Sequence, residues 1–239
     1  MAMIKKVDLR PEESRRRGQL KDEKPYVYEK IIRYPEKLER GECTAIIQFQ
    51  YDYLCNFHCQ HCSIAGFQKK KGGRFFTLDD VRELSRQADE MGLAQITITG
   101  GEPLVFPDFD QLVEAIDPRK FYIASDTNGW FLDEKRAKHL KSIGVDKVHL
   151  SIDSMDAKEH DDFRGHPGSH ERVLRAIDAA QSAGLNILIN TVVTKQRVHS
   201  EEFIEYLETM KAKDVPTLVL FPKLAGLWEG RFDMLVGPE

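Results

Sequence analysis

Three cysteines, Cys55, Cys59 and Cys62, stand within one stretch of eight residues. They directly follow Ala45–Tyr51, whose β-branched and aromatic residues are typical of a strand. Three thiolates on one short loop can hold three irons of a [4Fe–4S] cluster, and the fourth iron then has no protein ligand. The spacing therefore predicts a cluster that can bind a substrate or cosubstrate at its open iron.

The same loop carries His58 and His61, which allows a second interpretation. One histidine and the three cysteines would complete the four ligands of a structural zinc site. Zinc sites usually use C-x2-C pairs, however, and neighbouring histidines in so crowded a loop would chelate the ion awkwardly. The iron–sulfur interpretation is therefore favoured, with a zinc-binding structural protein as an alternative. The remaining cysteine, Cys43, is expected to be a buried thiol.

The composition is that of an ordinary globular protein of 239 residues, with 41% apolar and 31% charged residues. The formal net charge of −4 gives no reason to expect a nucleic acid or an anionic membrane as a partner. Met1–Arg10 lacks the apolar stretch of a secretory signal, and no apolar run approaches the ~18 residues of a membrane span. We therefore expect a soluble, cytoplasmic protein. That compartment is reducing, so the crowded cysteines favour a metal site over disulfides.

The elements that must position the cysteines repeat along the chain. Gly92–Thr99, Gly144–Ser151 and Gly184–Thr191 each contain a glycine that ends a helix, an apolar residue, a polar turn and an alternating β-branched run. Helical patterns separate these runs. Strands are expected within 45–51, 92–99, 121–125, 144–151, 184–191 and 217–221, and helices within 78–91, 108–116, 133–143, 170–183 and 201–213.

Six strands that alternate with helices predict a parallel α/β architecture. Right-handed crossovers curl such units into a barrel, and six units favour a partial (β/α)6 TIM-like barrel that is open on one side. We assign this core to residues 43–222. Residues 1–42 are dense in charge and are expected to form a solvated arm packed loosely on the core, with Arg15–Arg17 as an alternative phosphate-binding patch. Residues 223–239 are expected to be a tail, or the start of a further C-terminal region.

Chemistry in parallel βα folds collects at the C-terminal ends of the strands, and those positions are polar here. Thr99–Pro103 follows the second expected strand, and Ser125–Gly129 follows the third. At the fourth, His149, Ser151 and Asp153 share one face by period-two alternation. The cysteine loop follows the first strand, so we expect it to open onto the same rim.

With the cysteines and these strand ends in place, the chain resembles a radical S-adenosylmethionine (SAM) enzyme. The resemblance rests on the three cysteines together with Gly100-Gly101-Glu102-Pro103 one βα unit later, and it covers roughly residues 43–222. It implies that the amino and carboxylate groups of SAM chelate the open iron of the cluster. Cys55, Cys59 and Cys62 are then the metal ligands and, through the cluster, the catalytic residues.

The resemblance also implies a set of contacts to SAM. Gly100 and Gly101 let the backbone approach closely, and their carbonyls and the Glu102 carboxylate accept hydrogen bonds from the SAM ammonium. Ser151 and Asp153 match a position that relatives use for the ribose hydroxyls. The remaining expected contacts are Pro103 in the same motif, Arg164 as the partner of the SAM carboxylate, Asn128 and Asn190 as contacts to SAM or substrate, and His61, which stands where relatives usually place an aromatic residue near the adenine.

Several residues have plainer interpretations when they are taken singly. Ser151 and Asp153 are then ordinary polar residues at a strand end, and Arg164, in a loop near two aspartates, makes a surface ion pair. Asp126 is a candidate substrate contact, with a capping role at the strand end as the alternative. His149 is expected to line the barrel or to pack inside it.

The implied reaction begins when an external one-electron donor of the flavodoxin or ferredoxin type reduces the cluster. The C5′–S bond of SAM then breaks, and the 5′-deoxyadenosyl radical abstracts hydrogen from a substrate in the barrel. The substrate stays open between a small metabolite, a natural-product precursor and a peptide. A SAM- and cluster-binding module without catalysis is the alternative, although the two glycines and Glu102 are all present.

The core most resembles the branch that includes molybdopterin-type cyclases and the peptide- and sugar-modifying SPASM and twitch subfamilies. Those subfamilies often bind extra clusters through several C-terminal cysteines. No cysteine follows Cys62 here. We therefore expect either a one-cluster enzyme or a chain whose auxiliary-cluster domain lies beyond residue 239.

Overall fold

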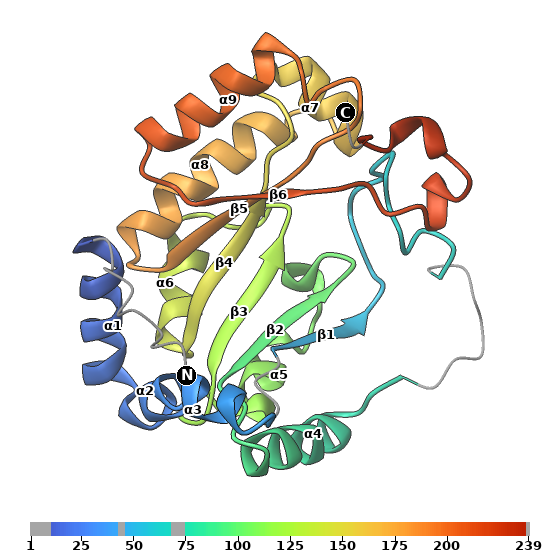
Figure 1. Cartoon of the computed structure of the whole chain (residues 1–239). Helices are drawn as coiled ribbons and strands as arrows, with labels where there is room; N and C mark the ends of the chain where they lie inside the picture. Colours follow the sequence, from blue (N-terminus) through green and yellow to red (C-terminus); the bar gives the residue numbers. More distant parts are fainter. Residues whose placement is uncertain (1–10, 43–45, 68–74, 238–239) are drawn as a thin grey trace.

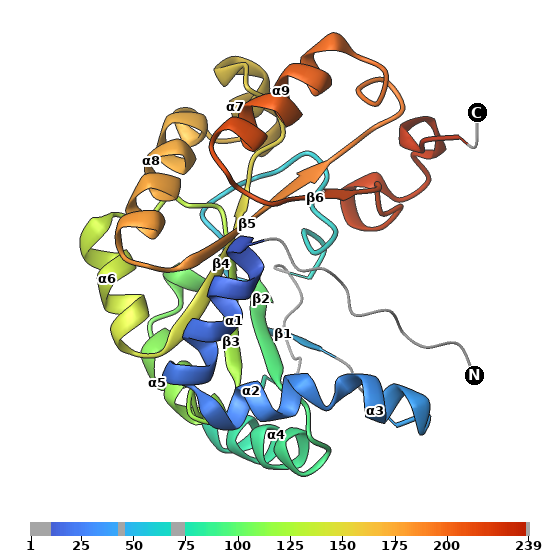
Figure 2. The same ribbon diagram turned by 60° about the vertical axis from the view of Figure 1, so that its left-hand side comes forward.

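The structure is a computed structural model that describes residues 11–42, 46–67 and 75–237. Within these ranges, six strands form one sheet in the order β1-β2-β3-β4-β5-β6, and every neighbouring pair is parallel. The strands are β1 Ile47–Asp52, β2 Gln95–Gly100, β3 Tyr122–Thr127, β4 Val145–Ser151, β5 Asn186–Val192 and β6 Thr217–Leu220. The first and last strands do not pair with each other, so the sheet is curled but not closed (Figures 1 and 2). The predicted partial barrel is confirmed.

Helices alternate with the strands and cover the outer face of the sheet (Figure 1). They are α4 Leu78–Glu90, α5 Phe109–Ile116, α6 Glu134–Ser142, α7 Ala157–Arg164, α8 Ser169–Ser182 and α9 Glu201–Ala212. The sequence patterns predict all of these except α7. That helix has eight residues, and its buried side chains, His160 and Arg164, are polar, so it lacks an apolar stripe.

Side-chain caps fix where several helices begin. The Thr77 hydroxyl accepts a hydrogen bond from the backbone N–H of Asp80 at the start of α4. Asp133 and Ser200 cap α6 and α9 in the same way. Such caps satisfy N–H groups that have no partner within the helix and stabilise each start by about 1 kcal/mol.

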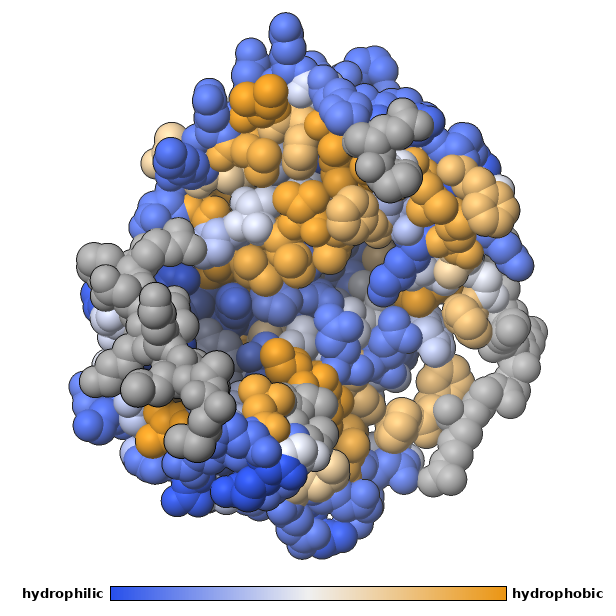
Figure 3. Space-filling view, in the orientation of Figure 1, coloured by the Kyte–Doolittle hydropathy of each residue, from blue (hydrophilic) through white to orange (hydrophobic). Residues whose placement is uncertain are grey.

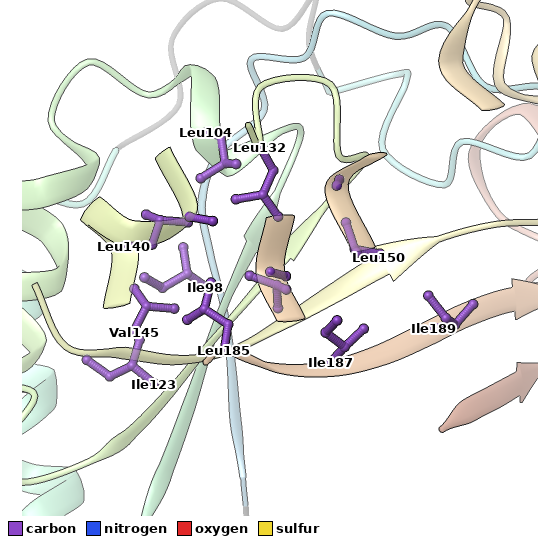
Figure 4. Close-up of a cluster of buried hydrophobic side chains, with 14 of the residues drawn as sticks. Ile98, Leu104, Ile123, Leu132, Leu140, Val145, Leu150, Leu185, Ile187 and Ile189 are labelled. Atoms are coloured by element: carbon purple, nitrogen blue, oxygen red, sulfur yellow. The ribbon is translucent and has the colours of Figure 1, made fainter. Parts of the chain in front are cut away.

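The hydrophobic core lies between the sheet and its helices. Ile98, Ile123 and Leu150 of the strands and Leu140 of α6 belong to this core, and all four are fully buried (Figure 4). On β5 the burial alternates, because every second side chain faces this core and the others face the inside of the curled sheet. The inner face therefore stays available for polar residues.

Three further helices, α1 Pro11–Glu23, α2 Pro25–Ile32 and α3 Tyr34–Glu39, run past the N-terminal ends of the strands (Figure 2). Lys24, which precedes α2, Lys30 of α2 and Lys37 of α3 are largely buried and donate to backbone carbonyls near the starts of β2, β3 and β4. The acceptors are Phe121 and Gly144 for Lys24, Leu93 and Lys120 for Lys30, and Met91 for Lys37.

These contacts differ from the loosely packed, solvated arm that the sequence predicts for this segment. Charge density alone misleads here, because a lysine buries its aliphatic stem while its ammonium satisfies carbonyls. Burial lowers the pKa of Lys30, and the Asp89 carboxylate beside it opposes that effect. The helices cover the end of the barrel opposite the cysteine loop. A phosphate-binding role for Arg15–Arg17 stays a prediction.

Candidate active site

A cavity of about 450 Å³ lies inside the curled sheet, and all six strands contribute to its wall. Figure 3 shows this face of the molecule hollowed, with hydrophilic residues in the hollow and a band of hydrophobic residues above it. The predicted site residues that line the cavity are Cys55, Cys59, His61, Cys62, Gly100, Gly101, Arg164 and Asn190. The structure thus brings most of the predicted site together. Glu102, Pro103, Asn128, Ser151 and Asp153 do not line this cavity.

The loop that carries the cysteines is held by backbone hydrogen bonds to the end of β2. The N–H of Gly101 donates to the carbonyl of Asp52 at 3.0 Å, and the N–H of Glu102 donates to that of Leu54 at 2.8 Å. A Cβ on Gly101 would stand 2.1 Å from the Leu54 oxygen, so no side chain fits there. The glycine motif therefore first serves the contact between two loops of this chain.

Two later segments also hold this loop. The N–H of Gln60 donates to the carbonyl of Phe163 at the end of α7, at 2.9 Å. The N–H of Leu227, in the short 3-10 helix Gly226–Trp228, donates to the carbonyl of Cys62 at 3.1 Å. The segment after β6, expected to be a tail, thus returns to the cysteine loop and closes one side of it.

The three thiols are half-buried and face one cavity. Burial raises the pKa of Cys55 to about 11. Burial also raises the pKa of Cys59, while the guanidinium of Arg164 beside it acts in the opposite direction. A positive charge next to a thiol favours thiolate, the form that binds metal.

These residues fit an iron–sulfur cluster better than a single metal ion. Within the described ranges, no group of three His, Cys, Asp or Glu side chains is close enough to hold one ion. A [4Fe–4S] cluster takes each thiolate on a different iron, so three separated thiols around one cavity suit it. Of the two histidines that the zinc alternative could use, His61 stacks on Phe163, with ring centroids 4.5 Å apart.

Glu102 lies behind the cavity wall and not on it. Its side chain is fully buried and accepts hydrogen bonds from Thr127 Oγ1 at 2.7 Å and from the backbone N–H groups of Asn128 at 2.6 Å and Leu104 at 3.0 Å. Burial raises the pKa of Glu102 to about 7, although these donors lower it. The carboxylate fastens the end of β2 to the end of β3. This geometry differs from the predicted contact between the carboxylate and SAM.

Pro103 follows Glu102 and begins the short 3-10 helix Pro103–Val105. It is buried, and Glu102 is the N-cap of that helix. The proline thus shapes the turn behind the cavity and makes no part of its lining.

Asp153 and Arg164 form a buried ion pair. Arg164 Nε and Nη2 donate to Asp153 Oδ2 at 2.6 and 2.5 Å, and the backbone N–H of Val192 donates to Asp153 Oδ1 at 2.8 Å. Burial acts to raise the pKa of Asp153, but the Arg164 charge and further neighbours hold it below its usual value. The expected surface pair is wrong, because α7 carries the arginine inside. The pairing also differs from separate contacts of these two residues to the ribose and the SAM carboxylate.

Ser151 ends β4 and pairs in register with Asn190 on β5. Ser151 is half-buried, and Asn190 lines the cavity with its buried Oδ1 lacking a hydrogen-bond partner within the described chain. Asn190 is therefore the better placed of the two for a ligand inside the barrel.

His61 lies in an aromatic cluster at the edge of the cavity. Its ring stacks on Phe163 and lies 5.7 Å from the ring of Trp228. Burial, together with the Arg164 charge, lowers the pKa of His61 to about 4. The neutral, planar ring has the shape that a flat base would stack on. Sequence reasoning missed Phe163 and Trp228, and only the adjacency of Phe163 to Arg164 signals either of them.

Asn128 ties β3 to the cysteine loop. Its Nδ2 donates to Asn56 Oδ1 at 2.9 Å, and its Oδ1 accepts from the N–H of Trp130 at 2.9 Å. The nitrogen and the oxygen of the Asn128 side chain thus both form hydrogen bonds within the chain. Asn56, which lies next to Cys55 in the sequence, was not predicted, although its position beside the first cysteine is a usable signal.

A family model described as the radical SAM superfamily matches residues 53–210, which is more than half of the 239 residues. The chain belongs to the radical SAM superfamily. The family prediction is confirmed, and with it the cofactors, a [4Fe–4S] cluster and SAM. None of the helices in the described ranges is long and apolar enough to cross a membrane.

Curated relatives of this radical SAM chain include two kinds of enzyme. It is 32% identical over 167 residues to the AdoMet-dependent heme synthase of Nitratidesulfovibrio vulgaris, covering 70% of this chain and 45% of that protein. It is 31% identical over 172 residues to the probable GTP 3′,8-cyclase of Methanosarcina mazei, covering 69% of this chain and 51% of that protein. The chain spans about half the length of the curated relatives that it matches.

Solved structures share the fold at lower identity. Streptococcus suis SuiB bound to its precursor peptide SuiA aligns with a TM-score of 0.63 and 19% identity, over 86% of this chain and 45% of SuiB. Native anSMEcpe with bound AdoMet aligns with a TM-score of 0.60 and 22% identity, over 76% of this chain and 52% of that one. These matches support the partial-barrel fold but do not indicate the substrate or the reaction of this chain.

Proposed function

We propose that this chain is the catalytic core of a radical SAM enzyme. The observation that carries the proposal is that three thiols from one short loop line the same cavity as all six strands. The cofactor, when bound, supplies a low-potential electron that cleaves SAM to methionine and a 5′-deoxyadenosyl radical, which abstracts hydrogen from the substrate. The protein itself binds and orients SAM and the substrate and excludes water from the cavity.

In this proposal Cys55, Cys59 and Cys62 hold the cluster. The backbone of Gly100 and Gly101, which lines the cavity, binds the polar end of SAM. Glu102 and Asn128 act one layer behind by fixing the loops, as their hydrogen bonds to other parts of the chain suggest.

Arg164 has two neighbours in this arrangement, Asp153 and Cys59. We propose that its charge orients Cys59 and lies beside the SAM carboxylate, while Asp153 keeps the guanidinium in place. Ser151 and Asn190 supply polar groups at the ends of β4 and β5, and His61 offers its neutral ring to the adenine.

The substrate and the electron donor belong to this proposal as well. The named relatives act on different molecules, and SuiB binds a peptide, so likeness alone does not choose between a small metabolite, a natural-product precursor and a peptide. We propose a flavodoxin- or ferredoxin-type protein as the electron donor and the cytoplasm as the compartment, because an exposed low-potential cluster needs a reducing environment.

Reconstitution without oxygen tests the proposal. The full chain is loaded with iron and sulfide, reduced with dithionite in the presence of SAM, and assayed for 5′-deoxyadenosine by mass spectrometry. Serine in place of any of the three motif cysteines should abolish the product and lower the iron content. Cys43→Ser is the matched control and should leave both unchanged, because Cys43 lies outside the motif. The expectation that Cys43 is a buried thiol concerns a residue outside the described ranges.

A SAM-binding module without catalysis gives a different outcome. It would bind SAM and carry four irons but would form no 5′-deoxyadenosine under these conditions. That result would contradict the proposed activity while leaving the fold and the cofactors intact.

A further inference from the structure

A second pair of residues stands on the cavity wall, separate from the cysteines and the glycine motif. Asp126 of β3 and His149 of β4 are neighbours in register, and Asp126 Oδ1 lies 2.7 Å from His149 Nδ1. Both side chains line the cavity. His149 is 8% exposed, and its other ring nitrogen, Nε2, is buried with no hydrogen-bond partner in the described part of the chain.

The carboxylate determines what that free nitrogen can do. When the neutral imidazole donates its Nδ1–H to the Asp126 carboxylate, Nε2 is a hydrogen-bond acceptor. A buried acceptor without a partner is unfavourable, and native proteins rarely keep one without a role. Because His149 lines the cavity, a molecule bound there can supply the missing donor.

The histidine lies deeper in the barrel than the rim where SAM contacts are expected. His149 precedes Ser151, the last residue of β4, by two positions, or about 7 Å along the strand. It pairs in register with Leu188 on β5. Asn190, two residues beyond Leu188, brings a second buried acceptor without a partner, its Oδ1. Both residues line the same cavity, and each carries a buried acceptor without a partner in the described chain.

Strands on the two sides of this pair give that space two kinds of wall, and Lys223 after β6 adds an ammonium group to the lining. Strands β1 and β2 contribute amide and hydroxyl groups, whereas β5 and β6 contribute aliphatic side chains. The polar residues are Gln48, Gln50 and Thr99, and the aliphatic ones are Leu188, Val192, Leu218 and Leu220. An occupant that satisfies both walls carries hydrogen-bonding groups on one side and a hydrocarbon portion on the other.

We propose that His149, oriented by Asp126, is a substrate-binding residue that accepts a hydrogen bond from a hydroxyl or amide N–H of an amphiphilic organic substrate. The hydrocarbon portion of that substrate packs against β5 and β6, where the C–H bond to be broken lies. The inference rests on the proposed function, because it takes the barrel cavity as the place where the radical meets its substrate. Asp126 is a positioning residue that holds the imidazole through Nδ1 and so selects the tautomer of the neutral ring in which Nε2 is the acceptor.

A second Asp–His pair in the same protein provides a built-in comparison. His139 Nε2 lies 2.6 Å from Asp110 Oδ2, but His139 is 40% exposed and lies on the outer helix α6, outside the barrel cavity. His139→Phe therefore breaks an Asp–His pair without touching the cavity. His149→Phe removes the acceptor at similar volume, and His149→Gln restores an acceptor through its side-chain carbonyl.

The experiment uses the reconstituted full chain with SAM and two matched pairs of probes. Deuterated 3-methylbutan-1-ol is compared with its methyl ether, and deuterated N-methyl-3-methylbutanamide with the N,N-dimethyl amide, so a methyl group replaces the donor hydrogen in each pair. The effect of the added methyl group is common to all protein variants and cancels when their ratios are compared. Saturation-transfer NMR gives the dissociation constant of each probe. After reduction, mass spectrometry gives the deuterium transferred to 5′-deoxyadenosine.

In the wild-type protein and in His139→Phe, at least one donor probe should bind about three- to tenfold more tightly than its methylated partner. His149→Phe should bring that ratio close to one, and His149→Gln should restore part of it. Deuterium transfer should follow the same order. The hydroxyl and the amide pair together decide which kind of donor the site prefers.

Equal binding of the matched probes to the wild-type protein, or a ratio that survives in His149→Phe, overturns the inference even if 5′-deoxyadenosine is formed. Donor-dependent binding without any 5′-deoxyadenosine leaves the site in place and contradicts the proposed function. The binding measurement therefore tests the role of His149, and the formation of 5′-deoxyadenosine separately tests the proposed function.

Discussion

Replacing Arg164 with methionine should destabilise the protein by about 3–5 kcal/mol. In the structure, two nitrogens of Arg164 donate to Asp153 at 2.5 and 2.6 Å, and less than a tenth of either side chain is exposed. Methionine fills similar space, but it leaves the Asp153 carboxylate buried with the backbone N–H of Val192 as its remaining close donor. The cost is that of an unpaired buried charge, which exceeds the worth of an exposed ion pair.

Urea unfolding of the apoprotein, followed by circular dichroism, measures this cost. The matched control is Lys158→Met, which breaks an ion pair with Asp162 on the same helix, where both side chains are mostly exposed. The control should shift the free energy of unfolding by about 0.5 kcal/mol or less. A second variant, Asp153→Asn with Arg164→Met, should recover most of the loss, since neither charge is then left alone.

A loss for Arg164→Met no larger than that of the control would refute this reasoning. So would a double variant that is as unstable as the single one, because the destabilisation would then come from lost packing and not from an unpaired carboxylate.

Two further predictions concern the loops behind the cavity. The pKa of Glu102 in the folded protein is about 7, above its ordinary value of 4.5. The contribution of this residue to stability is therefore fully present below pH ~4.5 and is lost as the pH rises through ~7. In urea titrations over that range, the difference in unfolding free energy between wild type and Glu102→Gln should fall by about 3 kcal/mol. Gly101→Ala should lower the melting temperature and the iron content, because the new Cβ meets the Leu54 carbonyl, whereas Gly66→Ala meets nothing within 4 Å; equal behaviour of the two variants would contradict the close approach.

Much of the fold is predictable from the sequence, because its signals are local. A glycine, a polar turn and an alternating β-branched run recur at Gly92, Gly144 and Gly184, and each begins a unit that the structure contains. The cysteine loop follows β1 and the glycine motif follows β2, so their meeting at one rim follows from parallel pairing.

The parts that escaped prediction depend on contacts that leave no periodic trace. Helix α7 buries His160 and Arg164, and α2 and α3 bury Lys30 and Lys37, so their inward faces look polar in the sequence. A hydrophobic pattern detects only faces that pack by apolar contact. The charged N-terminal segment was therefore predicted to be solvated.

In the site, too, local sequence signals predict some features, and others depend on contacts between distant residues. Spacing predicts which residues gather at this end of the sheet, but not which of them line the cavity or which side chains pair with each other. Asp153 meets Arg164 through the α7 turn, and Asp126 meets His149 through the register of β3 and β4. Register across strands is set by the assembled sheet, so single-strand alternation places His149 on the inner face without naming its partner.

The central claim is that the cluster held by this loop leaves one iron for SAM. Electron paramagnetic resonance of the reduced, reconstituted protein tests it directly, with SAM labelled by 15N at its amino group. We predict that SAM changes the spectrum of the cluster and that pulsed measurements detect hyperfine coupling from the labelled nitrogen, as expected for an amino group bound to iron. A fully loaded [4Fe–4S] cluster whose spectrum is unchanged by saturating SAM, with no coupling to the label, would contradict the claim.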